Sequence, residues 1–207
     1  MATPKIPTQS KGGFHDTVNM YCAENQREAD IFYNRLRSRL EAVNAWETYS
    51  DKVKTGFALF QPGTRNTTTA LEEGNLIRID IPGIGNPRGK GYDWTKIVDI
   101  QKREDGDYPF FSFTVKPCPF YGESEEPVAH FYTEDASSTF IVRRFGTCIY
   151  AEVHGRNAVE NCTDGDLLDN LRNKSVAIGS KLGIGNLNWL AFTESLLRPF
   201  LNQKPHH

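Results

Sequence analysis

The chain has 207 residues, with 24 Lys and Arg against 26 Asp and Glu and a formal net charge of −2. This length is enough to bury roughly two thirds of the unfolded surface in one domain, and the near-neutral charge argues against DNA or RNA as a partner. No apolar run approaches the ~18 residues of a membrane span, so we expect no membrane partner either.

The sequence also indicates how many domains the chain forms and in which cellular compartment it folds. We expect residues 1–15 to form a polar lead and residues 16–205 to form a single α+β domain. No signal peptide is visible at the N-terminus. The four cysteines never form a Cys-x-x-Cys pair, and we interpret them as free thiols: Cys22, Cys118, Cys148 and Cys162. Free thiols fit a reducing compartment, so we expect a cytoplasmic protein.

The predicted elements follow one another as helix, strands and helices. Apolar residues at helical spacing, from Ile31 to Val43, predict a helix over residues 23–45. Short alternating runs then predict seven strands, at residues 54–61, 76–81, 92–102, 109–116, 128–132, 138–144 and 147–154. No helix separates them, so we expect a curved, mainly antiparallel sheet or a partly closed barrel of six to seven strands. Apolar stripes at residues 163–182 and 188–200 predict a C-terminal pair of helices.

The segment RIDIPGIGNPRGKGYDW, at residues 78–94, joins a well-patterned strand to a glycine-rich stretch. A phosphate-binding loop needs its glycines to lead into a helix, whose N-terminal amides bind the anion. Here they lead into another strand, so we predict a long strand-to-strand connection whose Arg88 and Lys90 are candidates for contact with an anionic ligand. The second GIGN, at residues 183–186, is predicted to join the two C-terminal helices.

Residues 137–157 predict a hairpin with one apolar and one polar face. A two-residue turn at Phe145 and Gly146 would pair Phe140 with Ala151. The apolar face would then carry Phe140, Val142, Ile149, Ala151 and Val153. The opposite face would carry Ser137, Thr139, Arg143, Cys148, Tyr150, Glu152 and His154.

This polar face, with Arg156 just beyond it, is the candidate binding face. Glu152 and His154 are two residues apart on one strand, near enough for the carboxylate to orient or charge the imidazole, as in general acid–base catalysis. The alternative is an ordinary solvated sheet face, on which each polar pair contributes only roughly 0.2–1 kcal/mol.

His130 adds a second histidine to the candidate face, with Glu134 and Asp135 close behind it. Together with His154, these side chains have the ligand types of a zinc or iron site. Their spacing lacks the His-x-His and His-x-x-x-His patterns, so we expect no metal and no cofactor.

Four stretches resemble a family of uncharacterised bacterial proteins of about this length: WETYS, RIDIPGIG with GYDW, AHFYTEDASSTF and AEVHGRN. The resemblance covers most of the chain from Trp46 onward and implies a bacterial single-domain protein with no known activity. The predicted order of elements is also similar to that of the helix-grip ligand-binding barrels, although residues 183–186 interrupt the C-terminal helical region. A shared fold would not fix the function.

The sequence supports two functional hypotheses. The first is a non-catalytic protein-binding or assembly module, whose polar face and glycine loop engage another protein or a second copy of the chain. The alternative is a small-molecule-binding barrel or an enzyme, in which Arg143, Tyr150, Glu152 and His154 line a pocket. The solvent exposure of His154 discriminates between an open polar face and a buried one.

Overall fold

The computed structural model describes residues 3–49, 55–82, 85–123, 125–161 and 189–201. Within these residues, seven strands form one antiparallel sheet: β1 (Gly13–Cys22), β2 (Gly56–Phe60), β3 (Leu76–Asp80), β4 (Asp93–Arg103), β5 (Phe110–Pro117), β6 (Ser137–Phe145) and β7 (Cys148–Ala158). Their order is β1-β7-β6-β5-β4-β3-β2, so β1 and β2 form the two edges and the sheet is not closed into a barrel. The predicted α+β class with an antiparallel sheet is confirmed.

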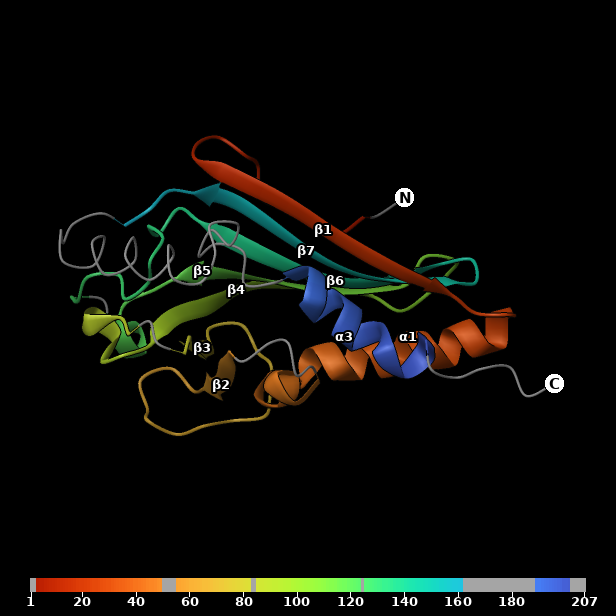
Figure 1. Ribbon diagram of the computed structural model, residues 1–207, viewed down its shortest axis with the longest axis horizontal. Coiled ribbons are helices and arrows are strands. Elements are labelled where there is room, and N and C mark those ends of the chain that lie inside the picture. Colours follow the sequence, from red (N-terminus) through yellow and green to blue (C-terminus); the bar gives the residue numbers. More distant parts are fainter. Residues whose placement is uncertain (1–2, 50–54, 83–84, 124, 162–188, 202–207) are drawn as a thin grey trace.

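The longer helices cover one face of this sheet, which we call the inner face (Figure 1). They are α1 (Gln26–Glu41), the 3-10 helix η1 (Val43–Tyr49) and α3 (Trp189–Leu201). Two single-turn 3-10 helices, Pro87–Gly89 and Phe120–Gly122, lie in connections between strands. In the described part of the chain, no helix combines the length and the apolar character needed to cross a lipid bilayer.

Trp46 of η1 is the centre of the core between the helices and the inner face. Its side chain is 1% exposed, and its indole N–H donates to the backbone oxygen of Leu40 over 3.0 Å. Its ring lies 5.1 Å from that of Phe57, 5.2 Å from that of Phe140 and 4.8 Å from that of Phe192. Aromatic pairs at these separations stabilise a core beyond their buried area, so this residue joins β2, β6 and α3.

The N-terminal region differs from the prediction, because a strand precedes the first helix. β1 begins inside the predicted polar lead and pairs with β7, while the helix predicted over residues 23–45 is divided into α1 and η1. The strand was missed because its alternation is inverted. Phe14, Val18 and Met20 are exposed, and the alternate positions that face inward include His15 and Asn19. A period-2 pattern predicts a strand most clearly when the apolar residues face the core.

The β6–β7 hairpin has the predicted faces and a different register. Phe145 pairs with Cys148 and Phe140 with Val153, so the turn lies at residues 146–147 and each pairing is shifted by two residues. A shift of two keeps every side chain on its predicted face, since side chains alternate with a period of two. The five predicted apolar residues are therefore all buried in the core.

The remaining predicted elements agree with the structure in part. β2 to β5 and α3 correspond to predicted elements, with ends that differ by one or two residues. The strand predicted at residues 128–132 is wrong, because only isolated bridges form there, at Val128 and Tyr132. The helix predicted at residues 163–182 and the joint at residues 183–186 lie outside the described residues.

Residues 3–12, which we call the lead, run across the opposite face of the sheet, the outer face. The backbone N–H of Lys5 donates to the Gln101 side chain on β4 over 3.0 Å. The backbone N–H of Ser10 donates to Asn157 Oδ1 on β7 over 2.8 Å. Because β5 and β6 lie between β4 and β7, the lead crosses these two strands.

The cysteines also differ from the prediction of free thiols. Cys22 and Cys148 form a disulfide between β1 and β7, and among the described residues only Cys118 is free. The pairing follows from β1, which the sequence analysis did not include. The argument from free thiols to a reducing compartment therefore no longer holds.

Candidate functional site

The predicted polar face is assembled in the structure, and Asp16 of β1 completes it. His154 lies between two carboxylates: Nδ1 is 2.5 Å from Asp16 Oδ1, and Nε2 is 2.9 Å from Glu152 Oε2. Both ring nitrogens donate only in the imidazolium form, so this arrangement favours the charged ring. Asp16 was missed because it stands opposite His154 on the unpredicted strand.

Two arginines extend these contacts into an outer charge network of Arg143, Glu152, His154, Asp16 and Arg156. Arg143 donates to Glu152, and Arg156 Nη2 lies 2.7 Å from Asp16 Oδ1. Burial opposes charge on His154, but the hydrogen bonds to Glu152 and Asp16 outweigh it and raise the His154 pKa. Burial likewise opposes charge on Glu152, but the bonds from His154 and Arg143 lower its pKa.

The geometry of this network favours a structural role. Each nitrogen of His154 is already engaged, and Glu152 and His154 are each 7% exposed. Thr3, Pro4 and Ile6 of the lead share a groove with Glu152 above the outer face. The network ties β1 to β7 and leaves no ring nitrogen free to act as a base.

The other predicted site residues lie elsewhere or extend the same face. Tyr150 stacks under Arg143, with the guanidinium carbon 4.4 Å from the ring centroid. The Nζ atom of Lys90 lies 4.9 Å from the centroid of the Phe120 ring. Arg88 belongs to the 3-10 turn Pro87–Gly89. His130 lines a pocket on the inner face, so it does not join His154 in a metal site. Within the described ranges, no group of three or more His, Cys, Asp or Glu side chains is arranged to hold a metal ion.

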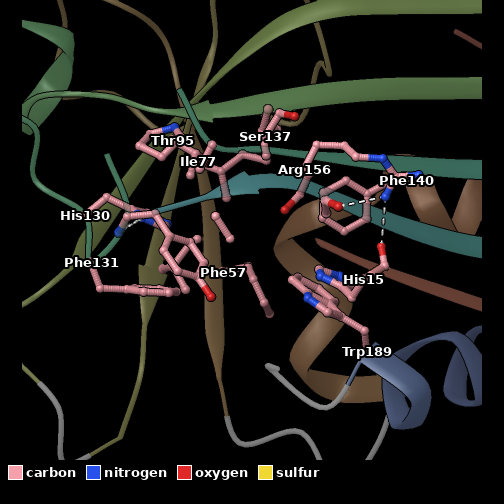
Figure 2. Close-up of a pocket in the computed structure, with 18 of the residues that line it drawn as sticks. His15, Phe57, Ile77, Thr95, His130, Phe131, Ser137, Phe140, Arg156 and Trp189 are labelled. Atoms are coloured by element: carbon pink, nitrogen blue, oxygen red, sulfur yellow. Dashed lines mark hydrogen bonds between the residues drawn. The ribbon is translucent and has the colours of Figure 1, made fainter. Parts of the chain in front are cut away.

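The inner face contains a pocket between the strands and the helical layer (Figure 2). Its cavity has a volume of about 60 Å³, several times the roughly 10–15 Å³ that one water molecule needs. Aromatic side chains form much of its wall: Trp46, Phe57, Phe131, Phe140 and Trp189. An apolar concave site with a few polar groups is typical of small-molecule binding.

A glycine shapes one side of this pocket. A Cβ atom on Gly155 would lie 2.1 Å from Cε1 of His15, so the imidazole occupies the space that any larger residue would fill. The same imidazole is nearly parallel to the Trp189 ring, at 8° and with centroids 6.4 Å apart. Gly155 of β7 thereby lets β1 place His15 inside the pocket.

Several polar groups in the pocket wall lack partners. In the described part of the chain, three buried polar atoms among the lining residues have no hydrogen-bond partner: His15 Nε2, Thr95 Oγ1 and Ser137 Oγ. Burial lowers the pKa of His130 to about 3, so this lining histidine is neutral. The residues come from distant elements and form no local motif. Sequence reasoning had placed Ser137, His130 and Arg156 on or beside the candidate face, but it had not selected His15 or Thr95.

Comparisons with known proteins find similarity in structure and not in sequence. No family model matches the chain, and no curated protein matches it. A hypothetical protein from Helicobacter pylori is similar with a TM-score of 0.47 and 8% identity, over 96% of this chain and 99% of the other. Truncated norcoclaurine synthase from Thalictrum flavum gives 0.40 and 10%, over 96% and 100%. A START superfamily protein from Mycobacterium smegmatis gives 0.36 and 11%, over 89% and 99%.

The predicted protein-binding or assembly module is wrong, and its alternative is retained. The prediction treated the polar hairpin face as a free docking surface, whereas Glu152 and His154 are buried and bonded to each other within the outer charge network. The site for the small-molecule alternative moves from the Glu152–His154 face to the inner pocket.

Proposed function

We propose that the chain binds a compact, mostly apolar small molecule in the inner pocket. The observation that carries this proposal is the pocket itself: an aromatic-lined cavity on the helix-covered face, with only a few polar atoms in its wall. Such sites bind by burying the apolar surface of a ligand, and their polar groups fix its orientation. The proposal assigns no catalytic step to the chain.

Filling the pocket should weaken binding. Ser138 lies at the start of β6 on the same face as Phe140 and lines the pocket while remaining partly exposed, so a larger side chain there projects into the cavity. We expect Ser138→Trp to weaken binding of the uncharged, apolar fluorescent probe N-phenyl-1-naphthylamine at least about tenfold. Fluorescence titration of the folded proteins measures this affinity.

The matched control places the same substitution on the far side of the helical layer. Ser38 is exposed on α1 and is absent from the pocket wall, so Ser38→Trp should leave the affinity for the probe unchanged. Failure of the wild-type protein to bind the probe would contradict the proposed function. Equal binding by wild type and Ser138→Trp would contradict it as well.

A further inference from the structure

The inner pocket has two polar ends and an apolar middle. Figure 2 shows Thr95 and His130 at one end, His15 and Trp189 at the other, and Phe57 between them. A ligand that only filled space would leave both ends without hydrogen bonds. The polar ends therefore carry information about the chemistry of the ligand.

Thr95 presents a buried hydroxyl with no partner. It stands opposite Ile77 of β3, on the face of β4 that lines the pocket, and it is 4% exposed. Its Oγ1 has no hydrogen-bond partner among the residues that the structure describes. An unpaired buried hydroxyl destabilises the folded chain. In the unliganded protein, valine at this position would therefore stabilise the fold at least as well as threonine does.

His130 supplies a hydrogen-bond donor at the same end. Its Nδ1 accepts the backbone N–H of Tyr132 over 3.0 Å, so the proton of the neutral ring resides on Nε2. The backbone N–H of Trp94 donates to the oxygen of Ala129 over 2.8 Å, which holds His130 beside Thr95. The Nε2–H group of this neutral ring is therefore a donor that a ligand oxygen can accept.

The charges around the pocket select against ions. No Asp or Glu is among the described lining residues. The guanidinium of Arg156 already donates to the backbone oxygens of His15 and Gly155 and pairs with Asp16. A buried ion would therefore lack a free counter-charge, and burial of an unpaired charge is costly.

We propose that the ligand is an uncharged, ring-sized compound whose hydroxyl or carbonyl oxygen bonds to Thr95 Oγ1 and accepts from His130 Nε2–H. This inference rests on the proposed function and specifies its ligand class. The hydroxyl of Thr95 donates to either kind of oxygen and also accepts from a hydroxyl. The ring of the ligand lies against the aromatic wall, and its oxygen takes the place of the partners that the protein lacks.

The test compares naphthalene with 2-naphthol by isothermal titration calorimetry. We expect wild type to bind 2-naphthol about tenfold more tightly than naphthalene, equivalent to ~1.4 kcal/mol. Thr95→Val keeps the shape of the side chain and removes the hydroxyl. It should reduce this preference to about threefold or less while raising the melting temperature, because an unpaired buried group is lost.

The matched control is Thr114→Val on the neighbouring strand. The Thr114 hydroxyl bonds to that of Thr139 over 2.9 Å, outside the pocket, so this variant should lower the melting temperature and keep the preference for 2-naphthol.

Equal affinity of wild type for the two compounds, or no binding of either, overturns the inference. An unchanged preference or a lower melting temperature in Thr95→Val also overturns it. The N-phenyl-1-naphthylamine experiment with Ser138→Trp tests the proposed function separately, so failure of the ligand class and failure of the pocket give different results.

Discussion

His154 is held by two carboxylates, and this fixes the sign of its effect on stability. Burial disfavours the imidazolium, but the bonds to Glu152 and Asp16 raise its pKa above the ordinary 6.5. A raised pKa in the folded state stabilises the protein at pH values below the unfolded pKa, and this contribution is lost as the pH rises through the folded pKa. Glu152 and Asp16 have lowered pKa values, so their contribution is present above the ordinary carboxyl range and lost in acid.

We therefore expect the stability lost in His154→Gln to be larger at pH 6 than at pH 9, because the wild-type ring loses its proton as the pH rises through its raised pKa. Urea unfolding of both proteins between pH 6 and pH 9 measures the difference in the free energy of unfolding. His15 and His130 have lowered pKa values and act with the opposite sign, but both proteins contain them, so their effects largely cancel. A difference that grows with pH would show that His154 does not hold its proton in this network.

At the scale of elements, the lead is attached to the sheet chiefly at one residue of β7. Asn157 has φ of +54°, and its Oδ1 accepts the backbone N–H groups of Ser10 and Lys11 over 2.8 and 3.2 Å. Its Nδ2 donates to the oxygen of Thr8 over 3.1 Å. Asparagine tolerates this left-handed conformation better than most residues and can bond to nearby backbone, so it suits the position.

Asn157→Gly should release the lead without straining the backbone. Glycine adopts the same φ, so only the side-chain bonds are lost, and we expect a destabilisation of about 1–2 kcal/mol with faster amide exchange in residues 8–12. Asn157→Ala should cost about 1 kcal/mol more, because its Cβ disfavours positive φ. Hydrogen exchange followed by mass spectrometry and urea unfolding measure the two effects. Unchanged exchange in the lead of Asn157→Gly would contradict this attachment.

For the whole molecule, what the sequence predicts depends on how far apart the interacting residues are in the chain. The β6–β7 hairpin and the Glu152–His154 pair were predicted because they are local and follow a period of two. The Asp16–His154 contact and the disulfide require β1, whose apolar residues face outward. The inner pocket collects residues from β1 to α3, and its unpaired hydroxyl at Thr95 is visible only when packing is known.

The disulfide constrains the largest part of the fold. Cys22 and Cys148 are 126 residues apart, so the covalent loop contains α1 and the strands β2 to β6. In the chain-entropy description, closure of a loop this long restricts the unfolded state and stabilises the folded state by up to about 5 kcal/mol, with about 2–4 kcal/mol typical.

We expect the Cys22→Ser/Cys148→Ser double variant to lose about 2–4 kcal/mol of unfolding free energy. Reduction of wild type should give the same loss, and reductant should not affect the double variant. If oxidised and reduced wild type unfold at the same urea concentration, the covalent loop does not contribute to stability, and the non-covalent pairing of β1 with β7 is sufficient to hold this edge of the sheet.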